Sequence, residues 1–270
     1  MWSVAGRDVA GASYPEPMAA DPTSTSARVQ LAAVAAAAAS APEEFAAFAG
    51  LSTPADSRAA AVLILFGVLD SLPSDHDAQS RAVSRDLDVL LLARATTLRS
   101  HPGQVAFPGG RLDPEDGDLH EVLSVPGGEV SAAHVRAAVR EAEEETGLDP
   151  HGVEVLGALA PVPLPVSNHL VTPVLGWWRD VSPVDVVDHA ESSLVFRVPV
   201  LDLIDPANRH SATVTRGRQT YRSPAFTVPV PGTASTVTVW GFTGVLLDRV
   251  LTALGWAVPW DTGRDLPAPL

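Results

Sequence analysis

Hydrophobic residues along the chain gather in short runs, and polar stretches rich in proline and glycine separate these runs. Runs of this length predict buried β-strands. The first two, 58–66 and 87–92, flank a polar, Asp-rich loop, so they could pair as neighbours. Further strands are predicted at 153–160, 170–178, 193–199, 220–228 and 236–240.

Helical patterns lie before, between and after these strands. Segment 28–39 is an alanine-rich helix, 132–146 follows a plausible N-cap at Ser131, and 242–254 is amphipathic. Strands on both sides of a central helix predict an α/β (α+β) fold, with a mixed sheet sandwiched between helices and an N-terminal helical extension. We expect three parts: a flexible tail with short Ala-rich helices (1–50), the main domain (51–260) and a frayed C-terminal tail (261–270).

Composition narrows the class of protein. The chain has 270 residues, of which 46% are hydrophobic and 19% charged, as expected of a soluble globular protein. It has no cysteine, which excludes disulfides and thiolate chemistry and fits a reducing cytoplasm. A net charge of −14 argues against a general nucleic-acid binder. No apolar run is long enough for a membrane span, so we expect a cytoplasmic protein that binds neither nucleic acid nor membrane.

Four of five consecutive side chains are carboxylates in the stretch that begins at Arg140 and ends with Gly147 and Leu148. On a helix, Glu141, Glu144 and Glu145 share one face. Three carboxylates on one face repel one another, and a hard divalent cation would relieve that repulsion. Two interpretations stay open from this stretch alone, a magnesium or manganese site and a solvated acidic helix.

A second unusual stretch follows the strand at 87–92. It contains Arg94, Arg99 and Gly103 and ends in Phe107-Pro108-Gly109-Gly110. Guanidinium groups suit phosphates, and paired glycines let the backbone turn tightly near a ligand.

Together these two stretches resemble the Nudix hydrolases. Segment 140–148 matches the whole second half of the Nudix box, and the arginine and Phe-Pro-Gly-Gly pattern is similar to the extra signature of the coenzyme A pyrophosphatases. Segment 239–244 is similar to the closing helix of that subfamily. One departure is Leu92, where the subfamily usually has Thr or Ser. The resemblance implies the Nudix fold and runs from about Arg58 to Leu254.

The spacing between the two motifs also departs from the subfamily. Gly110 and Arg140 lie 30 positions apart, about 15 more than expected, and the extra material is approximately 119–133. It contains Gly127-Gly128, an alternative start for the signature loop. The number of residues from Gly127 to Arg140 differs by one from the spacing in the Nudix box, so we prefer Gly109-Gly110 as the start. We expect the insertion to form a hairpin that turns at Gly127-Gly128.

The resemblance implies a metal-dependent hydrolase that cleaves the pyrophosphate of coenzyme A, with Mg²⁺ or Mn²⁺ as cofactor and phosphopantetheine and adenosine 3′,5′-bisphosphate as products. Glu141 and Glu145 are the expected direct ligands, one helical turn apart, and Glu144 a further ligand, directly or through water. The base is Glu141 or a carboxylate from a loop. Arg140 braces the box by pairing with Glu144 or with the loop, and Gly147 ends the helix. The resemblance also implies that Arg94, Arg99, Phe107, Gly109 and Gly110 contact the substrate.

Other residues carry a structural and a functional interpretation. Asp113, Glu115 and Asp116 are a solvated loop or ligands, and Glu191 is a candidate distal carboxylate. The histidines at 101, 134 and 169 are expected in turns or on the surface, and Trp177 and Trp178 are expected in the core. The expected binding partner is a small-molecule substrate. The sequence leaves open whether the chain forms a homodimer. The alternatives are a Nudix pyrophosphatase for other nucleoside diphosphate derivatives and a non-catalytic nucleotide-binding module whose site the insertion has closed.

Overall fold

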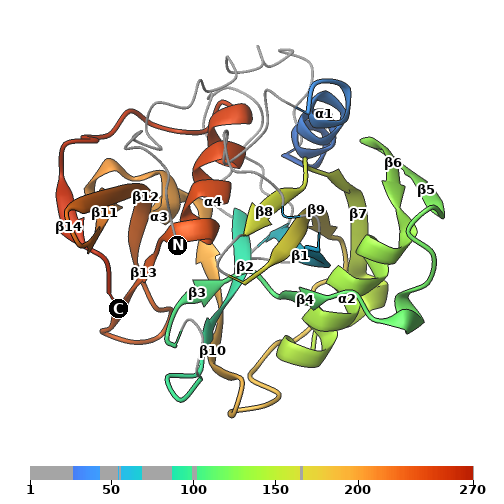
Figure 1. The fold of residues 1–270 in the computed structure, drawn as a ribbon, viewed down its shortest axis with the longest axis horizontal. Helices are drawn as coiled ribbons and strands as arrows, with labels where there is room; N and C mark the ends of the chain where they lie inside the picture. Colours follow the sequence, from blue (N-terminus) through green and yellow to red (C-terminus); the bar gives the residue numbers. More distant parts are fainter. Residues whose placement is uncertain are drawn as a thin grey trace.

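The computed structural model describes residues 27–42, 54, 56–68, 87–98, 102–164 and 167–269. Its centre is a mixed sheet in the order β10-β2-β1-β9-β7, with the short strands β3, β4 and β8 attached to β2, β1 and β9 (Figure 1). β1 and β9 run parallel, and the other pairs in this sheet are antiparallel. The strands are β1 (Arg58–Val68), β2 (Leu87–Arg94), β3 (Val105–Ala106), β4 (Gly109–Arg111), β7 (Val153–Ala158), β8 (Val162–Leu164), β9 (His169–Trp178) and β10 (Ser192–Pro199).

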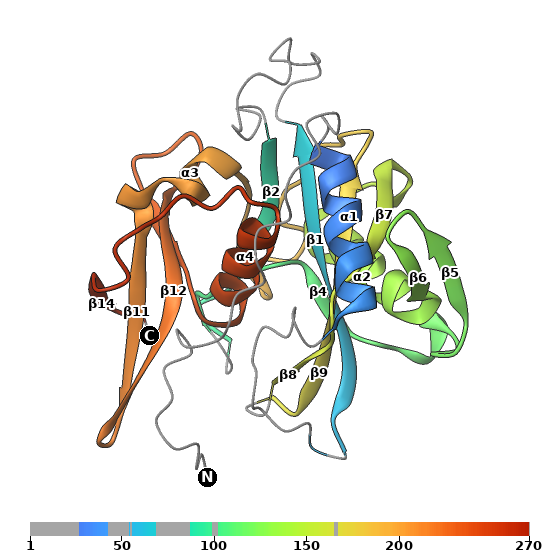
Figure 2. The same cartoon turned by 90° about the horizontal axis from the view of Figure 1, so that it is seen from above.

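Helices cover both faces of this sheet, as Figures 1 and 2 show. Alternate residues of β1 point to opposite faces. Leu63 and Leu65 pack with α2 (Ala132–Thr146), whereas Ile64 and Phe66 belong to the core shared with α1 (Ala27–Ser40) and α4 (Gly241–Ala253). The predicted mixed sheet between helices, with an N-terminal helical extension, is therefore confirmed.

The central helix has the bounds that the sequence predicts. α2 spans Ala132–Thr146, and Gly147 ends it in the left-handed conformation (φ 71°), where a side chain would be strained. Ser131 stands at the N-cap position, but its side chain makes no capping hydrogen bond. The position of the helix is thus set by its buried alanine face and not by that cap.

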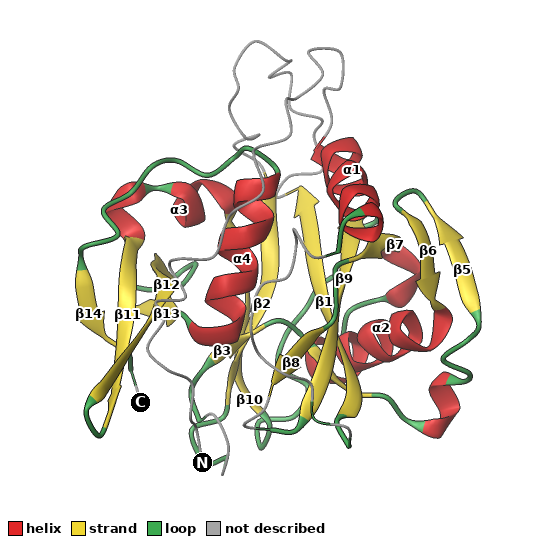
Figure 3. Cartoon of the chain, turned by 45° about the horizontal axis from the view of Figure 1, so that its top comes forward, coloured by secondary structure: helices red, strands yellow, loops and turns green. Residues whose placement is uncertain are grey.

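A second sheet lies beside the first, in the order β13-β12-β11-β14 (Figure 3). The sequence predicts only two of its strands, β12 (Gln219–Pro229) and β13 (Thr236–Val239), and misses β11 (Arg209–Arg216). The expected frayed C-terminal tail is wrong, because β14 (Asp265–Pro267) pairs in parallel with β11. The short helix α3 (Val200–Ile204) leads into this sheet, and α4 packs on β12.

The insertion forms a two-stranded hairpin of its own, as predicted, but its turn lies one residue earlier than the expected Gly127-Gly128. β5 (Val122–Val125) pairs with β6 (Gly128–Ser131), and Val125 lies opposite Gly128, so Pro126 and Gly127 make the turn. α1 packs on this hairpin and on β7, where Gly127 and Gly157 leave room for Ala35. Within the described residues, no helix is both long and apolar enough to cross a membrane.

Candidate active site

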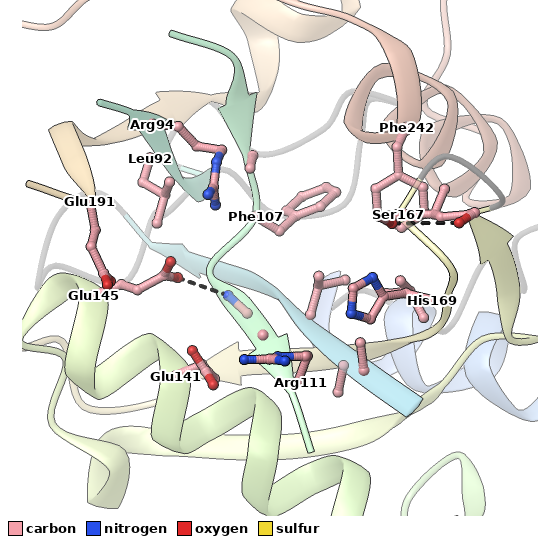
Figure 4. A pocket seen from close by; sticks show the side chains of 18 of the residues that line it. Leu92, Arg94, Phe107, Arg111, Glu141, Glu145, Ser167, His169, Glu191 and Phe242 are labelled. Atoms are coloured by element: carbon pink, nitrogen blue, oxygen red, sulfur yellow. Dashed lines mark hydrogen bonds between the residues drawn. The ribbon is translucent and has the colours of Figure 1, made fainter. Parts of the chain in front are cut away.

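A pocket of about 460 Å³ lies beside β4, where α2 approaches the main sheet (Figure 4). Side chains from both predicted motifs line it. The lining residues that matter below are Leu92, Arg94, Phe107, Gly109, Gly110, Arg111, Glu141, Glu145, His169 and Glu191. The structure therefore brings the arginine stretch, the glycine pair and the acidic helix to one place.

The glycine pair of the first motif contacts two carboxylates of α2. The backbone N–H of Gly109 donates to Oε2 of Glu145 at 2.9 Å. A Cβ atom on Gly110 would lie 2.3 Å from Cδ of Glu141, closer than any real contact. Gly109 is equally enclosed, because a Cβ there would lie 2.4 Å from the carbonyl oxygen of Ala61. Glycine at 110 therefore lets the loop lie against the Glu141 carboxylate, and glycine at 109 lets it lie against β1.

The three expected metal carboxylates are not equivalent. Glu141 and Glu145 line the pocket, and the side chain of Glu141 is 19% exposed. The side chain of Glu144 is 59% exposed, does not line the pocket and pairs with Arg140 at 3.2 Å. The structure thus brings two of the three residues to the pocket and leaves Glu144 at its outer side.

Arg140 ties the acidic helix to the loop that follows β4. Its Nε and Nη2 atoms donate to the two carboxylate oxygens of Asp116 at 3.1 and 3.0 Å, and Nη1 donates to Glu141 at 3.0 Å. The two pairings foreseen for Arg140, with Glu144 and with the loop, both occur. Asp116, expected in a solvated loop, is only 3% exposed. That expectation is wrong because Arg140 neutralises Asp116 as it is buried.

Burial governs the protonation of the pocket carboxylates. Loss of water raises the pKa of Glu145 to about 7, and the negative charges of Glu141 and Glu191 raise it further. The hydrogen bond from Gly109 N–H and the positive charge of Arg94 act in the opposite direction. Burial also raises the pKa of Glu141, against the stabilising contact of Arg140. The pocket therefore holds negative charge that its own arginines balance only in part, a setting that a bound cation would stabilise.

The structure describes only part of the stretch that contains Arg94 and Arg99. Arg94 lines the pocket, and its charge acts on Glu145. Phe107 is 3% exposed, belongs to the core, and also forms part of the pocket wall. Arg99 and His101 lie outside the described residues. Leu92, the departure from the subfamily pattern, is buried and lines the pocket.

Some residues that the sequence motifs mark only weakly, or not at all, also reach the pocket. Glu191 extends from the segment before β10 toward Glu145 (Figure 4), and His169 stands on the opposite side with Arg111. Arg111 follows the glycine pair directly, and no pattern in the sequence marks it or His169 as a ligand-binding residue. Asp113 also lines the pocket, whereas His134 lies on α2 outside it. Trp178 is buried and Trp177 packs against the core, as predicted.

The pocket offers oxygen donors for a cation. Among the residues that the structure describes, no three His, Asp or Glu side chains are placed to hold an ion together. The available donors are nevertheless the carboxylates of Glu141, Glu145 and Glu191, and the pocket contains no sulfur ligand. Hard cations such as Mg²⁺ and Mn²⁺ prefer this donor set, so the chemistry of the residues fits them.

Comparison with known families decides the class. The model of the NUDIX domain matches residues 77–216, which include the glycine pair, the hairpin and α2. The chain belongs to the Nudix family. The match stops short of α1 and α4, so the predicted limits of the Nudix domain, 51–260, stay a prediction.

Named Nudix relatives cover different shares of the chain. Nudix hydrolase 3 of Caenorhabditis elegans is 34% identical over 200 residues, which cover 68% of this chain and 77% of that protein. An uncharacterized Nudix hydrolase NudL of Cronobacter sakazakii is 37% identical over 131 residues, and the chain spans only 58% of its length. A crystal structure of a NUDIX hydrolase from Alicyclobacillus acidocaldarius is 19% identical, with a TM-score of 0.37 over 55% of this chain and 82% of that one.

Proposed function

We propose that this Nudix protein is a divalent-cation-dependent hydrolase that cleaves the pyrophosphate bond of coenzyme A or its derivatives. The products would be phosphopantetheine, or its derivative, and adenosine 3′,5′-bisphosphate. The observation that carries the proposal is the hydrogen bond from Gly109 N–H to Glu145. It joins the signature loop to the acidic helix in spite of the inserted residues between them, and Arg94 lines the same pocket.

Glu141 and Glu145 are the proposed ligands of Mg²⁺ or Mn²⁺, with Glu144 acting through water from the outer side. A bound divalent cation would neutralise the diphosphate and lower the pKa of a water molecule. Gly109 and Gly110 hold the loop against these two carboxylates, so the glycine pair fixes where the diphosphate would lie relative to them. Arg140 orients Glu141 from behind through their 3.0 Å contact.

Two carboxylates are candidates for the base that accepts the proton of the attacking water. Glu191 reaches the pocket from the side opposite α2 and has no hydrogen-bond partner for its carboxylate among the described residues. Glu141 is held in one orientation by the hydrogen bond from Arg140, which suits a fixed ligand better than a group that must approach the attacking water. We therefore assign the base to Glu191 and a ligand role to Glu141.

Arg94 is the proposed contact for the non-reacting phosphate oxygens. Its guanidinium points toward the pocket beside Leu92 and Phe107 (Figure 4), and its Nε atom is buried without a partner among the described residues. A phosphate oxygen would supply that partner. Arg99 belongs to the same proposal through the sequence motif alone.

The hairpin position weakens the alternative of a non-catalytic module. That alternative required the insertion to close the site, but no residue of the inserted segment 119–133 lines the pocket. The hairpin instead packs on α1 and β7. A Nudix pyrophosphatase for other nucleoside diphosphate derivatives is a second candidate, because Leu92 replaces the expected Thr or Ser inside the pocket wall.

An assay of the purified protein separates these candidates. Coenzyme A, NADH, ADP-ribose and deoxynucleoside triphosphates are each incubated with Mg²⁺ or Mn²⁺, and products are separated by chromatography. Release of adenosine 3′,5′-bisphosphate from coenzyme A, at the highest kcat/KM of the set, is the expected result. Turnover of the others without coenzyme A would favour the second candidate, and turnover of none would favour a binding module.

A further inference from the structure

The pocket has a second end, away from Glu145 and Glu191, which we call the basic end and define by Arg111 and His169. Leu164, Val171 and Phe242 form the apolar wall around it. Figure 4 shows the imidazole on the far side of Arg111 from Glu145 and Glu191. The proposed hydrolysis makes no use of this end.

Strand register places the two basic side chains on the same face of the sheet. Arg111 of β4 lies opposite Ala60 of β1, and Val171 of β9 lies opposite Ala60 on the other side. His169 precedes Val171 by two residues, so it shares that face. Gly110 points to the other face, toward Glu141. The pleat of β4 thus separates the carboxylates from the basic end.

The two basic side chains lie on strands that flank β1. Neighbouring strands are about 4.8 Å apart, so β4 and β9 lie about 10 Å apart across β1. Ala60, which has only a methyl side chain, stands between Arg111 and Val171, and His169 lies diagonally from Arg111, opposite Arg58. Both basic side chains line the same pocket, so one ligand there could contact the two together.

The electrostatic environment reverses sign at this end. Burial lowers the pKa of His169, and the positive charges of Arg111 and Arg58 lower it further. Three basic groups therefore influence one another here, in a chain with a net charge of −14. Two acidic lining residues are each partly neutralised by Arg140, Asp113 at 3.6 Å and Glu141 at 3.0 Å.

These groups have hydrogen-bonding capacity to spare. Nε2 of His169 is enclosed and has no partner among the described residues, while the backbone of Ser167 hydrogen-bonds with the ring. No ion pair of the Arg111 guanidinium occurs in the described part of the chain. A buried polar atom without a partner is unfavourable, and an oxyanion would relieve it at His169 by accepting from Nε2 of the protonated ring, a form that the charge of the ligand favours. The exposed guanidinium of Arg111 can pair with the same ligand.

We propose that Arg111 and His169 bind a phosphate monoester that the substrate carries in addition to its pyrophosphate. The carboxylate end would hold the scissile diphosphate, and the basic end would select nucleotides with a further phosphate on the ribose. The inference deepens the proposed function and rests on it, since it takes the pocket to be the nucleotide site. It assigns these residues to substrate selection and not to the chemical step.

Matched substrates test the selection. Coenzyme A carries a phosphate monoester on its ribose, and dephospho-coenzyme A lacks it. We expect the wild-type KM for dephospho-coenzyme A to exceed that for coenzyme A by about tenfold. His169→Ala and Arg111→Gln should bring this KM ratio close to one, whereas the exposed controls His151→Ala and Arg218→Gln should retain it. A ratio that Arg111→Gln and His169→Ala leave unchanged would overturn the proposal.

Binding without turnover keeps this test independent of the reaction. Calorimetry compares adenosine 3′,5′-bisphosphate with adenosine 5′-monophosphate on the wild type and the same four variants. The bisphosphate should bind about tenfold more tightly to the wild type and to both controls, and no more tightly to the two pocket variants. Tighter binding in a protein that hydrolyses neither coenzyme would refute the proposed function and support this site. Equal wild-type affinities would refute the site itself.

Discussion

The chain contains two Gly-Gly pairs 18 positions apart, and the structure uses them in opposite ways. Gly109 and Gly110 let a loop lie against the carboxylates of α2. Gly127 turns the inserted hairpin and lies against Ala35 of α1 and the carbonyl of Leu156, to which its N–H donates at 2.7 Å. The same dipeptide thus permits close approach to a candidate reactive group in one place and to a supporting helix in the other. Changes at the first pair should alter activity, and changes at the second should alter stability.

Glu145→Gln should have the largest effect on the first region. Glutamine can still accept from Gly109 N–H, so the loop should keep its position, but the charge needed to bind a cation is lost. We expect kcat to fall about 10³-fold, which corresponds to about 4 kcal/mol, with little change in Tm. Glu143→Gln is the matched control, because Glu143 is exposed on the other side of α2. Wild-type rates in Glu145→Gln would contradict the ligand assignment.

Gly110→Ala should act at the same place through shape alone. The new methyl group would overlap the end of a flexible side chain, Glu141, so that side chain can move and the fold should survive. A displacement of about 1 Å in a reacting group can reduce kcat about 10²-fold. Steady-state kinetics and thermal unfolding on the same preparation would test this. A loss of Tm that parallels the loss of activity would mean that Gly110 serves the fold.

Gly127→Ala should give the opposite result. Its methyl group would lie 2.6 Å from both Ala35 Cβ and a backbone oxygen, neither of which can move freely. We expect the free energy of unfolding to fall by about 1–3 kcal/mol, with kcat unchanged. Denaturant titration measures the loss, and addition of Ala35→Gly should recover part of it. A Gly127→Ala protein with full stability but little activity would remove the contrast between the two pairs.

Proton release on cation binding should be the smallest effect. The pKa of Glu145, raised to about 7, lies above the ordinary value of 4.5, so the cation-free folded state holds an extra proton between these values. That residue therefore favours folding most below pH 4.5, and its contribution declines as the pH rises through about 7. Calorimetry of Mn²⁺ binding in buffers of different ionisation enthalpy should show proton release at pH 6.5 that vanishes near pH 9. No release at pH 6.5 would place the cation away from Glu145.

The sequence predicts most of the main sheet and of α2, and little of the second sheet. Local patterns determine α2, β1 and β2, because apolar periodicity and the Gly147 stop signal lie within the segments themselves. β11 was missed because its burial depends on distant partners: Arg209 pairs with Asp248 of α4 and lies between the rings of Phe226 and Trp260. Charged residues buried in this way look like surface positions in a sequence.

The same contrast between local motifs and distant partners explains which residues of the candidate site the sequence predicts. Glu141, Glu145, Arg94 and the glycine pair belong to contiguous motifs and could be named in advance. Arg111 and His169 could not, because only the register of β4, β1 and β9 brings them to one face. Asp116 was expected in solvent because its partner Arg140 lies 24 positions away, beyond the insertion.

The attachment of α1 has a consequence for how the protein is made. Arg28 of this helix pairs with Glu154, and Gln30 accepts a hydrogen bond from the indole of Trp256 at 2.7 Å. These contacts span 126 and 226 positions of the chain. During synthesis α1 leaves the ribosome before β7 and Trp256, so the surface that receives it is complete only later. α1 must therefore wait for most of the chain before it can make all its contacts.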